Sequence, residues 1–192
     1  MGKPGSGKMT QANLLAQRMG FEIFSTGTQL RLLCQEETPF GLRVKTEMNE
    51  GKLLPSWIVE YLFHRKILSL HEKNGIVYEG AGRRLDEAEV IHDTMLWLAR
   101  PYRVVFLDIS DEESLDRRAK RQKTENRADD NEKAARVRLD WYYSDTAHSV
   151  EFFRGKGMLV AVNGEQDEAA VFAEMMEKLE ASGKVAERED AQ

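Results

Sequence analysis

Short apolar runs alternate along the chain with segments whose apolar residues recur every three or four positions. The clearest run is Val104–Leu107, a continuous apolar stretch typical of a strand buried on both faces of a parallel sheet. Other short runs predict strands at 21–24, 76–78 and 157–162. The periodic segments predict helices at 10–19, 25–37, 39–49, 55–72, 86–99, 111–121, 129–153 and 167–179. Strands that alternate with helices in this way predict an α/β protein with a parallel sheet.

The same pattern predicts one domain over residues 1–180. Segment 25–54 shows helical periodicity without a strand pattern, which predicts a helical insert between two strands of the sheet. Residues 122–126 are polar and lie between two periodic segments, so a short connector is expected there. The polar stretch 181–192 predicts a disordered tail.

Charge and composition exclude several classes of protein. The net charge is −5 over 192 residues, which argues against a nucleic-acid-binding surface as the main activity. Cys34 is the sole cysteine, so neither a disulfide framework nor a cysteine-based zinc site can form within the chain. No apolar run approaches the ~20 residues of a membrane span. We therefore expect a cytoplasmic protein that binds neither nucleic acid nor membrane.

The first candidate for chemistry is the stretch Gly2–Lys8, which fits the phosphate-loop pattern G-x-x-x-x-G-K. In such a loop, backbone N–H groups and the start of the following helix surround an anion, and the lysine adds a positive charge. A hydroxyl is expected directly after the lysine, but Met9 stands there and Thr10 follows it. The competing interpretation is a glycine-rich turn that precedes a lysine by chance.

A phosphate loop normally follows a buried strand. Only Met1 precedes Gly2, so the first strand is expected to be missing from this chain. Two explanations are open, a start that lies too late in the reading frame and a truncated product. In a doubly wound sheet that strand is usually central, so its loss is expected to be costly.

Several arginines lie where phosphate groups would need them, because a guanidinium pairs with phosphate through two parallel hydrogen bonds. Two of them follow the carboxyl ends of predicted strands, where ligands bind in open α/β sheets. The full set is Arg31, Arg83, Arg117, Arg121, Arg127 and Arg138. The competing interpretation is that each one is a solvated helix residue paired with a nearby acid.

These motifs together resemble those of the adenylate kinases, in the wider nucleoside monophosphate kinase family, from the loop to about residue 180. Gly5-Ser6-Gly7-Lys8-Met9-Thr10 resembles the family's G-x-G-K-G-T loop, in which the hydroxyl stands two places after the lysine. The other matching segments are Ser25-Thr26-Gly27 with Arg31, Gly51–Pro55, Glu79–Arg83, and Arg127–Glu132 with Arg138. The resemblance implies a three-layer α/β/α phosphate-loop fold with a central parallel sheet, here without its first strand.

The resemblance also implies roles for single residues. ATP would be bound by Gly5, Ser6, Gly7, Lys8, Met9, Thr10, Arg117, Arg121 and Gln166. The monophosphate would be bound by Thr26, Arg31, Lys52, Leu53, Leu54, Gly80, Arg83, Glu87, Arg127 and Arg138. The catalytic cations would be Lys8, Arg121, Arg127 and Arg138. Residues 25–54 would be the mobile monophosphate-binding block, and residues 122–126 a short lid. Mg²⁺ would arrive with ATP, placed partly by Thr10, with no dedicated cluster of protein ligands.

Four departures from the family pattern leave the acceptor base open. Met9 replaces a glycine, Thr28 replaces an aspartate, and Ala81-Gly82 replace a Phe-Pro pair. Glu87 stands where these kinases place a glutamine that reads the acceptor adenine. An ionised glutamate can only accept hydrogen bonds, which suits guanine better than adenine. The competing interpretation of Glu87 is a solvated helix residue.

The sequence thus predicts a Mg²⁺-dependent enzyme that transfers the terminal phosphoryl group of ATP directly to a nucleoside monophosphate. AMP is the favoured acceptor, giving two ADP. The alternatives are a kinase for GMP or for UMP and CMP, and a nucleotide-binding protein with weak catalysis. The four histidines show no metal-ligand spacing, so no protein metal site is expected. The expected partners are ATP and the monophosphate, and the expected state is a monomer.

Overall fold

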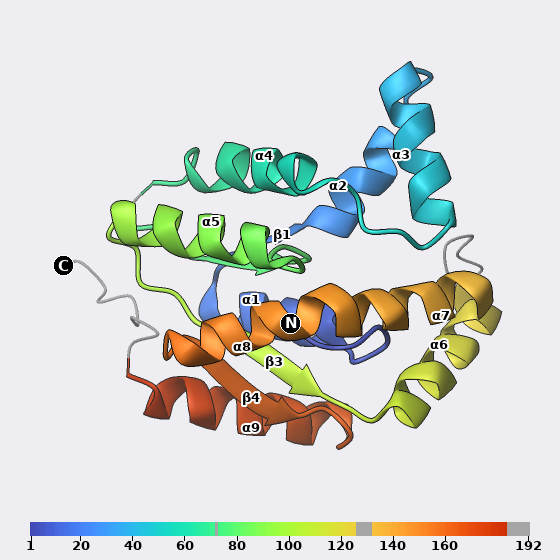
Figure 1. Ribbon diagram of the computed structural model, residues 1–192. Coiled ribbons are helices and arrows are strands. Elements are labelled where there is room, and N and C mark those ends of the chain that lie inside the picture. The colour runs from blue at the N-terminus through green and yellow to red at the C-terminus, as the bar shows by residue number, and fades with distance from the viewer. Residues whose placement is uncertain (72, 126–131, 184–192) are drawn as a thin grey trace.

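The computed structural model describes residues 1–71, 73–125 and 132–183 (Figure 1). Its helices alternate with short strands, as the hydrophobic pattern predicts. The helices of the first half are α1 (Lys8–Met19), α2 (Thr26–Leu33), α3 (Pro39–Asn49), α4 (Ser56–Ile67) and α5 (Leu85–Trp97). Those of the second half are α6 (Asp111–Glu125), α7 (Glu132–Trp141), the π-helical turn η2 (Tyr142–Thr146), α8 (Ala147–Gly155) and α9 (Glu168–Ala181).

The strands form two separate parallel pairs within the described part of the chain. Strand β1 (Glu22–Ser25) pairs with β2 (Ile76–Glu79), with Glu22 opposite Ile76. Strand β3 (Val104–Asp108) pairs with β4 (Leu159–Asn163), with Val104 opposite Leu159. The α/β class is therefore confirmed, but a single continuous central sheet is not what these strands form.

Residues Met1 and Gly2 lie along the edge of β3 that β4 leaves open. The backbone N–H of Leu107 donates to the carbonyl of Met1 at 3.0 Å, and Gly2 forms an isolated parallel bridge with Leu107. Two residues can make only this short ladder, so they do not join β3 to β2. Strands β2 and β3 instead line the same cavity, together with Met1 and Gly2.

Helices cover both sides of the strands and bury their apolar residues. On one side, Leu107 of β3 and Val160 and Val162 of β4 pack against α9, with Leu15 of α1 beside them. On the other side, Phe106 of β3 packs against Tyr142 and Val150, from η2 and α8. Figure 1 shows α9 beneath β4 and α8 across the opposite face. Helices therefore pack on both faces of the β3–β4 pair.

Helices α4 and α5 cover the first strand pair. Ile76 and Tyr78 of β2 pack against Phe63 and Ile67 of α4 and Met95 of α5. Helices α2, α3 and α4 share a further core, whose buried residues are Leu30, Val44, Leu54, Ile58 and Leu62. Two of these helices, α2 and α3, lie within the segment 25–54 that was predicted to be a helical insert.

Several predicted helix ends are wrong. Helix α2 ends at Leu33 instead of 37, because α3 packs closely against it: a Cβ on Gly41 would lie 2.6 Å from the carbonyl of Leu33. Helix α4 ends at Ile67 instead of 72. The predicted helix 129–153 is divided by η2, and its first residues, 129–131, lie outside the described residues.

The predicted connector 122–126 is also wrong for its first four residues, because α6 continues to Glu125. Pairs spaced four residues apart, Glu113 with Arg117 and Asp116 with Lys120, link successive turns of this helix. Residue 126 lies outside the described residues, as does the part of the predicted tail from 184 onward. The assignment of 122–126 as a lid stays a prediction. None of the helices in the described segments has the length and apolar character needed to cross a membrane.

Candidate active site

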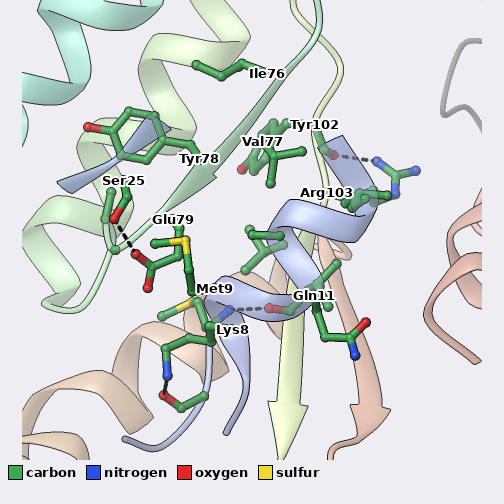
Figure 2. Close-up of a pocket in the computed structure, with 18 of the residues that line it drawn as sticks. Lys8, Met9, Gln11, Ser25, Ile76, Val77, Tyr78, Glu79, Tyr102 and Arg103 are labelled. Atoms are coloured by element: carbon green, nitrogen blue, oxygen red, sulfur yellow. Dashed lines mark hydrogen bonds between the residues drawn. The ribbon is translucent and has the colours of Figure 1, made fainter. Parts of the chain in front are cut away.

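A cavity of about 1640 Å³ runs from the phosphate loop along β2 and β3. Figure 2 shows Lys8, Met9, Ser25 and Glu79 gathered at one end, where β2 finishes. The opposite end is lined by apolar residues, among them Ile76, Val77 and Tyr102. The charged end lies at the carboxyl ends of the strands, the edge where open α/β folds bind ligands.

The phosphate loop wraps around the start of α1. Gly7 precedes the helix with φ of 83°, a left-handed conformation that a glycine adopts without strain. The Lys8 ammonium donates to the carbonyls of Gly2 and Lys3, at 3.0 and 2.7 Å, so it lies over its own loop. The N-terminus of a 12-residue helix and a lysine therefore meet at one end of the cavity, as an anion site requires.

Contacts from distant parts of the chain hold this loop from behind. The hydroxyl of Ser114, in α6, donates to the carbonyl of Pro4 at 2.6 Å. The Lys3 ammonium donates to the carbonyl of Ile109 at 2.8 Å and pairs with Asp111 at 2.7 Å. The loop is thereby fixed to the end of β3 and to the start of α6.

Glu79 ends β2 beside the loop. Its carboxylate accepts a hydrogen bond from the Ser25 hydroxyl at 2.9 Å (Figure 2). Burial acts to raise the pKa of Glu79, but the charges of Arg83 and Lys8 and the Ser25 hydrogen bond outweigh it and lower the pKa. Glu79 is therefore an anion placed among the cations of the site.

Arg31 and Arg83 approach each other around the start of α2. A Cβ built on Gly27 would lie 3.6 Å from Nη1 of Arg31. A Cβ built on Gly80 would lie 3.6 Å from Nη2 of Arg83. The same Cβ would lie 3.6 Å from the backbone nitrogen of Gly27. Both arginines line the cavity. Two guanidinium groups near one helix N-terminus are a candidate for a second anion site, apart from the phosphate loop.

Glu87 lies close to this second site without opening into it. The side chain is 2% exposed, so its interpretation as a solvated helix residue is wrong. One carboxylate oxygen accepts the backbone N–H of Arg83 at 2.9 Å. Burial raises the pKa of Glu87 to about 7, although the hydrogen bond and the charge of Arg83 oppose that shift.

The structure brings many of the predicted site residues to the cavity. Those that line it are Gly5, Gly7, Lys8, Met9, Thr10, Arg31, Leu53, Gly80, Arg83, Arg117 and Arg138. Arg117 also pairs with Glu113 one turn earlier in α6. Arg127 lies outside the described residues, and Arg121 is described only as part of the α6 backbone.

Other predicted site residues are placed elsewhere. Ser6 and Thr26 are buried, with the Thr26 hydroxyl 3.5 Å from that of Tyr78. Leu54 belongs to the core of the helical insert, and Lys52 pairs with Glu50 at 2.6 Å. The Gln166 amide donates to the carbonyl of Asn163 at 3.2 Å and to Glu174. In the described structure these five residues, like Glu87, are not among those that line the cavity.

Glu79 and Trp141 are among the cavity residues that were not assigned to the site from the sequence. Glu79 is the first residue of the matched segment Glu79–Arg83, so the motif could have identified it as a site residue. Trp141 lies in no matched motif. The Trp141 ring lies 5.3 Å from the Arg84 guanidinium, and Arg84 also donates to the carbonyl of Leu53 at 3.5 Å. These contacts link α7, the start of α5 and the helical insert.

Comparison with known proteins identifies the family. The sequence profile of the adenylate kinases matches residues 1–158. Adenylate kinase 1 of Nostoc sp. is 31% identical over 176 residues, covering 91% of this chain and 94% of the relative. The adenylate kinase of Phocaeicola vulgatus is 30% identical, with coverages of 93% and 95%, and that of Porphyromonas gingivalis is 36% identical, with 85% and 84%. The chain belongs to the adenylate kinase family, as the motifs of its cavity predict.

Proposed function

We propose that the cavity binds ATP at the phosphate loop and AMP at the site of the two arginines, and transfers the terminal phosphoryl group to give two ADP. Family membership makes the chain an ATP-dependent nucleoside monophosphate phosphotransferase. The observation that carries the assignment of the two sites is that Lys8, Arg31 and Arg83 line one cavity. A donor and an acceptor phosphate can then meet without a phospho-enzyme intermediate.

The donor half of the site consists of the phosphate loop and the first turn of α1. Backbone N–H groups at this helix start bind the β- and γ-phosphates of ATP, and the Lys8 ammonium exchanges its loop carbonyls for phosphate oxygens. Arg117 lies at the edge of the same cavity and packs against the adenine of ATP. In this way the loop holds the leaving phosphates of the donor.

The acceptor half consists of Arg31, Arg83 and the start of α2. The two guanidinium groups hold the phosphate of AMP with one oxygen facing the γ-phosphorus of ATP. That oxygen attacks the phosphorus in line with the departing β-phosphate oxygen, so one P–O bond forms as the other breaks. Arg138, which also lines the cavity, stabilises the charge of the transferring group, together with Arg121 and Arg127.

Adenylate kinases in general use Mg²⁺ with ATP, and the oxygen donors of this site fit that ion. Mg²⁺ is usually bound by substrate phosphates together with one or two carboxylates. The ionised Glu79 and the exposed Thr10, both at the cavity, are the residues that would hold it. When bound, the ion neutralises phosphate charge.

The position of Glu87 removes the argument for guanine. Its carboxylate is turned toward the backbone of Arg83 and is 2% exposed, so no base edge reaches it in this structure. A residue that does not contact the base gives no preference for GMP over AMP. The acceptor is then the one the family uses, AMP.

Steady-state turnover tests this proposal. ATP is supplied with AMP, GMP, UMP and CMP in turn, and diphosphate formation is measured. We expect turnover with AMP far above that with the other acceptors. Turnover confined to GMP or to a pyrimidine monophosphate would contradict the choice of AMP. ATP binding with no turnover on any acceptor would favour the alternative of a weakly catalytic nucleotide-binding protein.

Lys8→Met tests the donor half of the site. Removing a cation that acts on the transferring phosphates is expected to lower kcat by roughly 10²–10³-fold while the protein stays folded. The matched control is Lys156→Met, since Lys156 is exposed and lies beside Phe152, away from the cavity. Equal activity in the two variants would show that Lys8 plays no part in catalysis.

A further inference from the structure

The loop that delivers Arg83 to the cavity contains two glycines and no proline. It runs from Gly80 to Arg83, between the end of β2 and the start of α5. Gly80 and Gly82 both have left-handed backbones, with φ of 94° and 69°. Two glycines leave the unfolded loop with many accessible conformations, and a rigid residue such as proline is absent from it. Something outside the loop must therefore fix the direction of Arg83.

Glu87 supplies such a contact. It is the third residue of α5, and its side chain turns back over the helix start to accept the backbone N–H of Arg83 at 2.9 Å. A glutamate at this helix position often reaches back to a backbone N–H before the helix, which fixes the angle at which the chain enters. Here the fixed residue is the one whose guanidinium lies at the acceptor site.

Glu87 is buried in this structure, where no ligand reaches its carboxylate. Only 2% of the side chain is exposed, whereas Arg83 lines the cavity. The charged and titratable groups that face Glu87 are Arg83 and Asp86, with the Tyr78 hydroxyl on β2. The carboxylates of Asp86 and Glu87 repel each other. The Glu87 carboxylate is therefore held in place by the backbone N–H and by the positive charge of Arg83.

We propose that Glu87 is a positioning residue: it fixes the backbone of Arg83 so that the guanidinium faces the acceptor phosphate. The role depends on the proposed function, because it assumes that Arg83 binds that phosphate. It differs from reading the base, because every monophosphate carries the same phosphate. Glu87 then sets acceptor affinity without setting acceptor identity.

Two substitutions separate the hydrogen bond from the charge. Glu87→Ala removes the acceptor for the Arg83 N–H, and we expect the KM for AMP to rise roughly tenfold with the KM for ATP unchanged. Glu87→Gln keeps an amide oxygen in the same place, and we expect a KM for AMP within about twofold of the parent chain. The matched control is Glu89→Ala, which removes an exposed glutamate from the same helix.

Hydrogen exchange of the Arg83 amide gives a readout that does not depend on catalysis. We expect this amide to be protected in the parent chain and in Glu87→Gln, and to exchange at least about tenfold faster in Glu87→Ala. If the parent chain shows this pattern but no kinase activity, the proposed function fails while the anchoring contact stands. Unchanged exchange in Glu87→Ala would overturn the inference.

Acceptor preference distinguishes positioning from base reading. A positioning residue raises the KM for AMP and GMP by the same factor when it is changed to alanine, and leaves their ratio unaltered in Glu87→Gln. A shift of that ratio in Glu87→Gln would overturn the inference in favour of base recognition. A KM for ATP that rises as much as the KM for AMP in Glu87→Ala would also overturn it, because the effect would then be a general loss of structure.

Discussion

Two loops bring cations to the same cavity, and they are held in different ways. The phosphate loop, which carries Lys8, is tied to β3 by Gly2 and to α6 by the bond from Ser114 to Pro4. The acceptor loop, which carries Arg83, has a backbone contact to Glu87, four residues further along the chain. The hydrogen bond and bridge named for the donor loop are thus long-range, whereas the hydrogen bond that holds the backbone of Arg83 is local. Substitutions that break the contacts of the donor loop with β3 should therefore affect the whole fold, and loss of the Glu87 contact should affect one substrate.

The largest expected effect comes from Gly2→Ala. Gly2 has φ of 137°, and an added Cβ would lie 2.4 Å from the carbonyl oxygen of Leu107. The backbone must move away from β3, so we expect the free energy of unfolding to fall by roughly 3–5 kcal/mol. Denaturant titration measures the change. The control is Gly20→Ala, where φ is also positive but no heavy atom lies within 4 Å. Equal losses in the two variants would mean that contact with β3 does not matter.

A somewhat smaller effect is expected from pH at Glu87. Burial raises the pKa of Glu87 to about 7 in the folded chain, against 4.5 when it is free. The contribution of Glu87 to the free energy of unfolding is fully present below pH 4.5. It is lost as the pH rises from 4.5 through 7, because folding then requires the burial of a charged carboxylate. Between pH 4.5 and 8 this amounts to about 3 kcal/mol.

Glu87→Gln does not titrate and provides the comparison. The difference in the free energy of unfolding between Glu87→Gln and the parent chain is expected to grow with pH in favour of the glutamine variant. Denaturant titrations at several pH values measure this difference, which cancels the contributions of all other groups. A constant difference across this range would show that the pKa of Glu87 is not raised.

The smallest expected effect comes from Ser114→Ala. This buried hydroxyl makes one hydrogen bond behind the phosphate loop, so its loss should lower the free energy of unfolding by about 1–2 kcal/mol. The KM for ATP should rise by roughly two- to fivefold, with the KM for AMP unchanged, the reverse of Glu87→Ala. Ser144→Ala, at an exposed serine, is the control. A rise in the KM for AMP instead would remove the distinction between the two loops.

Much of the candidate site could be predicted from local sequence. The phosphate loop and the helix after it are set by residues within a few positions of each other, so Gly7, Lys8 and α1 occur where the motif predicts. The continuous apolar run at Val104–Leu107 predicts β3, because a buried strand needs apolar side chains on both faces. The motif match also predicted the family correctly.

The predictions that failed concern helix ends and the pairing of strands. The end of α2 is set by its close approach to α3 through Gly41, and the continuation of α6 to Glu125 crosses a stretch whose polarity alone indicated a connector. The pattern of strands indicated one sheet, but pairing depends on which edges meet, and the described strands pair as β1 with β2 and β3 with β4. Hydrophobic periodicity carries no information about these choices.

The sequence by itself determined that this protein belongs among the adenylate kinases and predicted a phosphate site at its first helix, because both inferences rest on short motifs. Tertiary structure decided which charged side chains meet. Arg31 and Arg83 are 52 positions apart and come together because β1 and β2 are paired neighbours. Glu87 resembled a surface residue or a base reader until the fold buried it against the backbone of Arg83. Burial and convergence arise from packing over long sequence separations, which no local pattern of residues specifies.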